Sequence, residues 1–268
     1  MTRSRRLSDD RRGLAAHPLK VLLAAIWLLL PSDASQARDL VVFAEPTLVT
    51  ALQRVGAAWR ERSGVRVNVF VAPTDLSLAQ IQRGARCDIV FAVAGRTTDD
   101  AEQQGIIKSK ANAPIFRNSL MLVARSGFAR PSASADRAEM AAFLQGKRLA
   151  IANPDRDPAG TQGLRWLREI GLANEDDNNL VVAESAAGVV RVLTDDFAQL
   201  GIVYATDAAA RPDLVVLMTL PDNNHRALEY VAVEASDPQS TTKPFFDFLR
   251  SQQAHGILQA AGLQVPGE

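Results

Sequence analysis

The chain alternates between short apolar runs and longer segments in which apolar residues recur every three or four positions. The longer segments predict amphipathic helices, for example over Leu48, Leu52, Val55 and Trp59. The short runs predict strands at 40–44, 65–72, 88–94, 118–124, 148–152, 180–183, 201–204, 213–219 and 229–234. Near-continuous apolar strands between helices are typical of largely parallel sheets covered on both faces. The pattern therefore predicts an α/β fold.

Two of these strands run into a threonine at the expected start of a helix. Thr47 follows the strand at 40–44 and precedes a helix at 48–62, and Thr74 follows the strand at 65–72 and precedes a helix at 75–83. A helix N-terminus has unpaired N–H groups and a partial positive charge, which attract anions. Two such ends facing each other across a cleft would hold a small oxyanion. Ordinary helix capping by threonine is the alternative interpretation.

The first 37 residues have the pattern of a secretory signal peptide. A basic start is followed by the apolar run 21–30, then by Pro31 and the small residues of 35–37. Ten apolar residues are too few to cross the roughly 30 Å of a bilayer core. We therefore expect cleavage after Ala37 and export of residues 38–268 to the periplasm.

Charge and cysteine content narrow the class of partner. The chain has 30 basic and 30 acidic residues, and removal of residues 1–37 takes away six and three of them, so the net charge becomes about −3. A weakly acidic protein lacks the basic surface that nucleic acid requires, so we expect no nucleic-acid partner.

Cys87 is the only cysteine, which excludes an internal disulfide and a cysteine-based metal site. Its place at the start of an apolar strand predicts a packing role.

The sequence contains no pattern typical of an enzyme. His225 and His255 are isolated from any serine or cysteine motif, and no cluster of histidine and carboxylate has metal-ligand spacing. The segment 158–163 is rich in small residues but lacks the lysine of a phosphate-binding loop. We therefore predict a binding protein rather than an enzyme, without a cofactor and without a metal that the protein coordinates directly.

Several short motifs, in this order and at these separations, resemble those of the periplasmic molybdate-binding proteins of ABC uptake systems. The resemblance covers the chain after residue 37. The motifs are Val42-Phe43-Ala44 with a hydroxyl at Thr47, Leu78-Ala79-Gln80-Ile81 with Gly84-Ala85, Asn118-Ser119-Leu120, Asn153-Pro154 with Pro158-Ala159-Gly160, Ala183-Glu184, and Gly201-Ile202-Val203-Tyr204.

The resemblance implies a type II periplasmic binding protein with two α/β lobes, each a mostly parallel sheet flanked by helices. Lobe 1 would comprise 38–120 plus 229–268 and lobe 2 would comprise 121–228, with the ligand in the cleft between them. The ligand would be molybdate or tungstate, bound by Thr47, Thr74, the N–H groups of Ala159 and Ala186, and the hydroxyl of Tyr204. It also implies a monomer that delivers the oxyanion to an ABC permease in the inner membrane.

Two carboxylates lie beside the predicted hydroxyls. Glu45 precedes Thr47 by two residues, and Asp75 directly follows Thr74. A carboxylate about 4 Å from a dianion repels it by roughly 1 kcal/mol per unit charge in water and by more in a dry site. An alternative ligand is therefore another small anion or a carboxylate that donates a hydrogen bond to Glu45 or Asp75. A further alternative is an exported accessory or sensor protein that presents its ligand to a partner other than a permease.

Overall fold

The computed structural model describes residues 38–108, 114–132, 135–172, 179–221, 228–234 and 241–266, all within one compact unit that begins at Arg38. The predicted signal peptide, His225 and the acidic run 175–177 lie outside the described residues. Within these ranges, no helix has both the length and the apolar character that a membrane crossing requires.

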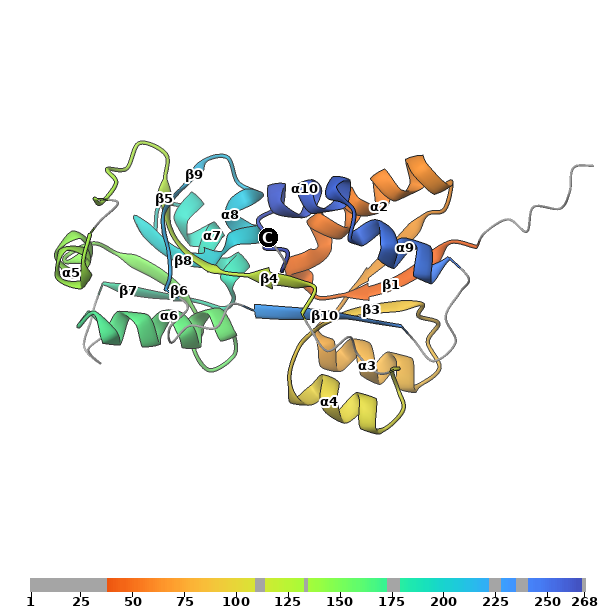
Figure 1. Cartoon of the computed structure of the whole chain (residues 1–268). Helices are drawn as coiled ribbons and strands as arrows, with labels where there is room; N and C mark the ends of the chain where they lie inside the picture. The colour runs from red at the N-terminus through yellow and green to blue at the C-terminus, as the bar shows by residue number, and fades with distance from the viewer. Residues whose placement is uncertain are drawn as a thin grey trace, which may run out of the picture. The chain divides into compact units, whose positions relative to one another are not determined.

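The first sheet and its helices come from the two ends of this unit (Figure 1). Its strands are ordered β2-β1-β3-β10-β4. The elements are β1 (Leu40–Ala44), η1 (Pro46–Leu48), α2 (Val49–Ser63), β2 (Val67–Val71), α3 (Thr74–Gln82), β3 (Ile89–Val93), α4 (Arg96–Gln103), β4 (Phe116–Asn118), β10 (Leu228–Glu234), α9 (Thr242–Leu249) and α10 (Gln252–Ala260).

The second sheet comes from the middle of the chain, and its strands are ordered β7-β6-β8-β5-β9. The elements are β5 (Leu120–Arg125), α5 (Arg137–Leu144), β6 (Leu149–Ala152), α6 (Pro158–Glu169), β7 (Leu180–Ala183), α7 (Ala186–Thr194), β8 (Leu200–Tyr204), α8 (Ala205–Ala209) and β9 (Leu214–Thr219).

The two sheets have the same topology. In the first, β1 pairs in parallel with β2 and β3, and β10 pairs antiparallel with β3 and β4. In the second, β6 pairs in parallel with β7 and β8, and β5 pairs antiparallel with β8 and β9. Each sheet therefore has one reversed strand among otherwise parallel ones. The prediction of two α/β lobes with mostly parallel sheets is confirmed.

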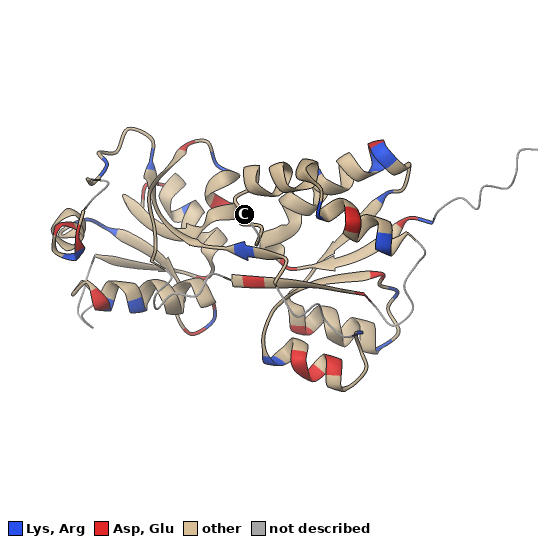
Figure 2. Ribbon diagram, viewed as in Figure 1, with Lys and Arg blue, Asp and Glu red and all other residues tan. Residues whose placement is uncertain are grey.

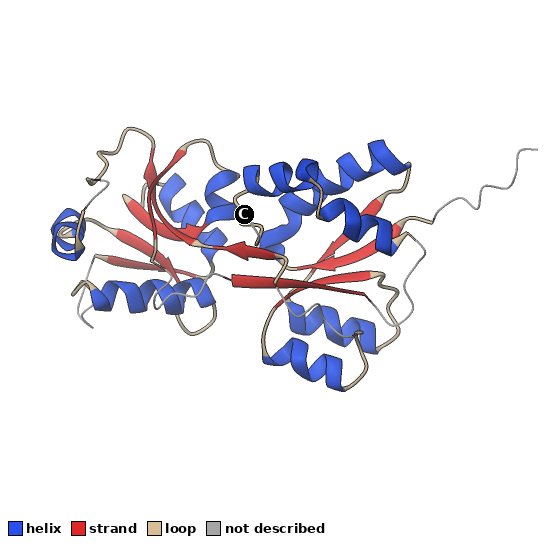
Figure 3. Cartoon of the chain, viewed as in Figure 1, coloured by secondary structure: helices blue, strands red, loops and turns tan. Residues whose placement is uncertain are grey.

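Helices cover both faces of each sheet (Figure 3). In the first lobe, α2, α9 and α10 pack on one face around Trp59, Phe245 and Phe248, while α3 and α4 contribute to a separate cluster on the other face. In the second lobe, Ile202 of β8 faces α6 and its neighbour Gly201 faces α7. Because successive strand residues point to opposite faces, α6 and α7 cover opposite sides of the sheet.

The chain passes between the lobes directly from β4 to β5, with Ser119 between the two strands. The return passage runs from β9 to β10. Near the first passage, the Ala205 N–H donates to the Ser119 carbonyl at 2.9 Å, and Asn118 Nδ2 donates to Thr206 Oγ1 at 2.9 Å. Hydrogen bonds therefore join the lobes where the chain crosses between them.

One feature of the sequence prediction needs correction. The strand expected at 118–124 is two strands, because the chain changes sheets at Ser119. Elsewhere, α9 is followed by a second helix, α10, whose Ala254 and Leu258 are buried. In lobe 2, α5 begins with a capping box formed by Asp136 and Glu139.

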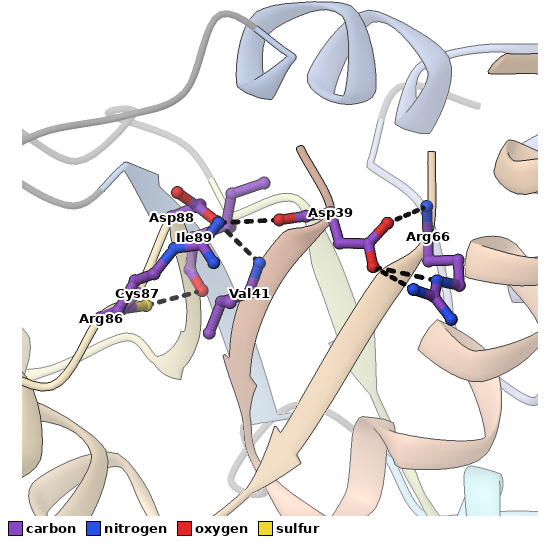
Figure 4. Close-up of polar contacts among 7 residues, drawn as sticks. All are labelled: Asp39, Val41, Arg66, Arg86, Cys87, Asp88 and Ile89. Atoms are coloured by element: carbon purple, nitrogen blue, oxygen red, sulfur yellow. Dashed lines mark hydrogen bonds and ion pairs between the residues drawn. The ribbon is translucent and has the colours of Figure 1, made fainter. Parts of the chain in front are cut away.

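A buried carboxylate ties β1 to the start of β3 (Figure 4). Asp88 is 1% exposed, and its Oδ2 accepts hydrogen bonds from the Val41 N–H at 2.7 Å and from Arg86 at 3.3 Å. Cys87 beside it is buried, as predicted, and burial raises the pKa of its thiol to about 12. Such a thiol stays protonated and unreactive at neutral pH.

We expect Asp88→Ala to lower the free energy of unfolding by about 2 kcal/mol, because it leaves the buried Val41 N–H without its acceptor. Chemical denaturation monitored by circular dichroism would measure this change. Asp39→Ala is the control, because it removes a more exposed pair with Arg66 in the same region (Figure 4), and such pairs contribute little to stability since water and salt screen them. Equal losses in the two variants would contradict the proposed importance of the Asp88 contacts.

Candidate ligand-binding site

A cleft of about 740 Å³ lies where the carboxyl ends of parallel strands from both sheets meet. Its lining comes from the segments after β1, β2 and β3 in the first lobe and after β6, β7 and β8 in the second. In α/β sheets, ligands bind beyond the carboxyl ends of the strands, because loops and helix N-termini gather there. The cleft therefore has the position expected of a ligand site.

Thr47 faces the cleft from η1, next to a tyrosine of β10. The hydroxyls of Thr47 and Tyr230 are 2.7 Å apart, and either can be the donor. Burial raises the pKa of Tyr230 to about 12, so its phenol stays protonated at neutral pH. Thr47 was a candidate helix cap, but η1 has no side-chain cap and α2 begins after Leu48. Its hydroxyl bonds to Tyr230 instead.

Thr74 is the first residue of α3 and is held by Glu45. One oxygen of Glu45 accepts from the Thr74 N–H at 2.6 Å and also from the Thr74 hydroxyl. The same hydroxyl accepts a hydrogen bond from the Val93 N–H at 3.0 Å. The N-cap of α3, Pro73, makes no side-chain cap, so Glu45 performs this role from the segment that follows β1. The interpretation of Thr74 as a cap is therefore wrong.

In the second lobe, Asp157 bridges the N-termini of two helices. Its Oδ1 accepts from the Ala159 N–H in the first turn of α6, and its Oδ2 accepts from the Ala186 N–H at the start of α7, both at 2.9 Å. Ser185 caps α7 by accepting from the Gly188 N–H at 3.2 Å. Both predicted backbone donors of lobe 2 therefore point at one carboxylate.

Tyr204 lines the cleft from the end of β8 and is 4% exposed. Its hydroxyl makes no hydrogen bond to any residue that the structure describes. Burial raises its pKa, and the nearby carboxylates of Asp157 and Asp207 raise it further. The Ala159 N–H is close enough to oppose this rise, but it donates to Asp157. Tyr204 is therefore a residue of the cleft wall whose buried O–H donor has no acceptor among the described residues.

Four further acidic or basic residues line the cleft besides Glu45 and Asp157. Asp75 and Arg96 belong to the first lobe, and Arg156 and Asp207 belong to the second. Burial is the main cause that raises the pKa of Glu45, and the charge of Asp75 raises it further. Away from the cleft, basic and acidic residues are interspersed over both lobes (Figure 2). The described residues contain no group of three or more His, Cys, Asp and Glu that could hold a metal ion.

The structure brings the five candidate residues together. Thr47, Thr74, Ala186 and Tyr204 line the cleft, and the Ala159 N–H adjoins it through Asp157. Asp157, Asp207 and Tyr230 were not anticipated. Asp157 could have been found as an N-cap before Pro158, since Asp is favoured there. Its second bond, to a residue 29 positions away, has no local sequence signal.

Comparison with known proteins places this fold in a family. The profile of the bacterial extracellular solute-binding proteins matches residues 40–264. The chain belongs to this family. It is a solute-binding protein rather than an enzyme.

Individual relatives agree with this assignment. The solute-binding protein is 29% identical over 228 residues to the molybdate-binding protein ModA of Escherichia coli strain K12, covering 84% of this chain and 89% of that protein. The periplasmic molybdate-binding protein of Azotobacter vinelandii has the same fold, with a TM-score of 0.64 at 20% identity over 85% of this chain and all of that one. The tungstate ABC transporter structure from Geobacter sulfurreducens gives a TM-score of 0.57 at 16% identity over 83% and 97%. These structures confirm the two-lobed periplasmic binding protein fold.

Proposed function

We propose that this solute-binding protein is the exported component of an ABC uptake system and binds a tetrahedral oxyanion, molybdate or tungstate, between its lobes. The observation that carries the proposal is the convergence of uncharged donors from both lobes on one cleft. Thr47 and Thr74 come from lobe 1, and Ala159, Ala186 and Tyr204 come from lobe 2. The names of the relatives support the choice of oxyanion.

Neutral donors suit a fully ionised oxyanion. Molybdate and tungstate offer only acceptor oxygens, so every contact with a hydroxyl or N–H group can be a charge-assisted hydrogen bond. Each contributes about 1.5–3 kcal/mol net. Five such contacts, after the cost of desolvation, are enough for the roughly −8 to −12 kcal/mol of a micromolar to nanomolar complex. No cofactor is needed for this function.

The remaining parts of the proposal concern export and delivery. Residues 1–37 direct export to the periplasm and are removed, and the protein acts there as a monomer. Lobe 1 comprises 38–120 plus 229–268, and lobe 2 comprises 121–228. The strands support this division apart from one residue at each crossing. The first sheet uses segments within 40–118 and 228–234 and the second uses segments within 120–219, so Leu120 lies in a strand of the second sheet and Leu228 in a strand of the first. The partner is an ABC permease of the inner membrane.

A second candidate function follows from the carboxylates at the cleft. Glu45 and Asp157 are acceptors, and a ligand that carries its own O–H or N–H group could donate to them. This favours another small anion or a carboxylate with a donor group, delivered to a permease or presented to a different exported partner. Phosphate and small hydroxycarboxylates represent this class in a ligand panel.

Calorimetric titration of the purified protein tests the choice of ligand. We expect one site per chain for molybdate and tungstate, and much weaker binding of sulfate. Molybdate and tungstate should also raise the melting temperature, because only the native state binds the anion. Stabilisation by phosphate or a hydroxycarboxylate, without stabilisation by molybdate or tungstate, would favour the second candidate. No binding of any tetrahedral oxyanion would reject the proposed function.

Tyr204→Phe tests the site itself. We expect binding to weaken by about 2 kcal/mol, or roughly thirtyfold in Kd, because the variant loses a hydroxyl donor to a charged ligand. Titration calorimetry would measure the change. Tyr230→Phe is the matched control: it removes the same group from the other tyrosine, whose hydroxyl contacts Thr47. We expect a smaller effect there, and wild-type affinity in Tyr204→Phe would show that Tyr204 does not contact the ligand.

A further inference from the structure

Three of the five residues proposed to bind the oxyanion have donor groups that are already bound to carboxylates of the chain itself. In lobe 1, Glu45 accepts from both the N–H and the hydroxyl of Thr74. In lobe 2, Asp157 accepts from the N–H groups of Ala159 and Ala186. Each of these donors has a single hydrogen. A ligand oxygen can therefore reach them only when the carboxylate leaves.

The two carboxylates occupy equivalent places in the two lobes. Glu45 follows β1 and reaches the N-terminus of α3, while Asp157 follows β6 and reaches the N-terminus of α7. β1 and β6 are equivalent strands, since the sheets share the orders β2-β1-β3 and β7-β6-β8. The contacts from Glu45 to Thr74 and from Asp157 to Ala186 each span 29 residues. The same arrangement is thus built into both halves of the site.

Tyr204 is independent evidence that a hydrogen-bond acceptor from outside the chain binds in the cleft. Its side chain is 4% exposed, it lines the cleft, and its hydroxyl has no partner among the described residues. A buried hydroxyl without an acceptor is unfavourable unless a ligand or water supplies one. Neither Glu45 nor Asp157 supplies it, although both lie at the same cleft.

We propose that Glu45 and Asp157 are internal occupants of the two halves of the site, and that the oxyanion binds by displacing their carboxylates from Thr74, Ala159 and Ala186. This inference rests on the proposed function. A carboxylate presents two oxygens to N–H and O–H donors much as an oxyanion does, so each occupant satisfies the helix N-termini while the cleft holds no ligand. Binding is then an exchange of acceptors, and only an anion that is a better acceptor than a carboxylate enters.

Displacement predicts that neutral variants bind the anion more tightly. Glu45→Gln and Asp157→Asn keep an oxygen acceptor for the same donors, so they preserve the capping of the helices. A neutral amide is a weaker acceptor than a carboxylate and does not repel a dianion, so we expect each variant to bind molybdate about tenfold more tightly than wild type, or more. A merely structural cap would instead give equal or weaker binding when altered.

Titration calorimetry with molybdate on the wild type, Glu45→Gln, Asp157→Asn and the double variant tests the inference. Asp75→Asn is the comparison for charge alone, because it removes an exposed cleft carboxylate that holds none of the donor groups of Thr74, Ala159 and Ala186, and we expect a smaller gain in affinity than in Glu45→Gln or Asp157→Asn. Equal or weaker binding by Glu45→Gln and Asp157→Asn, with normal binding by the wild type, would overturn displacement and leave the proposed function intact.

Two other outcomes are equally decisive. If Asp75→Asn binds as tightly as Glu45→Gln, the gain reflects the overall charge of the cleft, and displacement is wrong. If no variant and no wild-type protein binds molybdate or tungstate, the proposed function fails and the inference fails with it. Tight binding by the neutral variants with weak binding by the wild type would show that the carboxylates of Glu45 and Asp157 limit the affinity for the anion, as displacement requires.

Discussion

Replacing Gly160 with alanine is expected to lower the free energy of unfolding by about 3 kcal/mol, at the upper end of the usual cost of overpacking. A Cβ at this position would lie 2.3 Å from the carbonyl oxygen of Ala152 and 2.7 Å from the backbone carbon of Asn153. Both are backbone atoms, which cannot turn aside as a side chain can. The N-terminus of α6 would have to move away from the end of β6, and Ala159 would move with it. Chemical denaturation would measure the loss of stability. Molybdate titration would measure the loss of affinity that we expect from the movement of Ala159.

Gly188→Ala in α7 is the control for this prediction. A Cβ there would lie 3.4 Å from the Cβ of Ala183, which is ordinary van der Waals contact. Alanine also has a higher helix propensity than glycine by about 1 kcal/mol, so we expect unchanged or slightly increased stability. If Gly160→Ala unfolds at the same denaturant concentration as wild type, the close approach of α6 to β6 is not needed for the fold.

The fold could be predicted from the chain because its signals are local and repeated. The apolar positions Leu48, Leu52, Val55 and Trp59 recur at helical spacing, and all four are buried in α2 and the turn before it. The apolar runs at 40–44 and 180–183 coincide with β1 and β7. Motifs shared with a family then identified which strand ends face each other. Helix α10 was missed because only two residues separate it from α9, and the spacing of apolar residues shows no strong break between the two helices.

The hydrogen bonding of the cleft could not be predicted, because it depends on residues far apart in the sequence. Threonine before a helix is usually an N-cap, and that local preference suggested capping roles for Thr47 and Thr74. In the structure their hydroxyls bond to Tyr230, 183 residues away, and to Glu45, 29 residues away. Sequence reasoning identified Glu45 as a carboxylate that would repel a dianion bound beside Thr47. It could not show that Glu45 holds the donors of Thr74.

We expect Asp207→Asn to stabilise the protein at pH 7.5 and to have no such effect near pH 4. Burial is the main cause that raises the pKa of Asp207 from 3.8 to about 6, and the charge of Asp157 contributes to this rise. The Oδ2 atom of Asp207 is buried and has no hydrogen-bond partner among the described residues. Ionisation of this group is therefore disfavoured in the folded protein relative to the unfolded chain.

The sign of the effect follows from proton linkage. A carboxyl whose folded-state pKa is raised binds more protons when folded, so its contribution to stability is complete below pH 3.8 and is lost as the pH rises through about 6. At 1.36 kcal/mol per pKa unit, the loss is at most about 3 kcal/mol. Asparagine cannot ionise and avoids this loss. Denaturation of wild type and variant at pH 4, 5, 6 and 7.5 should therefore give stability curves that separate over this window.

Asp213→Asn is the control of opposite sign. A hydrogen bond from Arg211 is the main cause that lowers the pKa of Asp213, so its ionised form favours folding at neutral pH and the variant should lose stability there. A gain in both variants at pH 7.5 would reflect the removal of negative charge in general. A gain in Asp207→Asn that persists unchanged at pH 4 would show that its ionisation is not the cause, because Asp207 in the folded wild type is then as neutral as the asparagine that replaces it. Only a gain in stability confined to the higher pH values would show that ionised Asp207 destabilises the folded protein at its place in the cleft, near Asp157 and Tyr204.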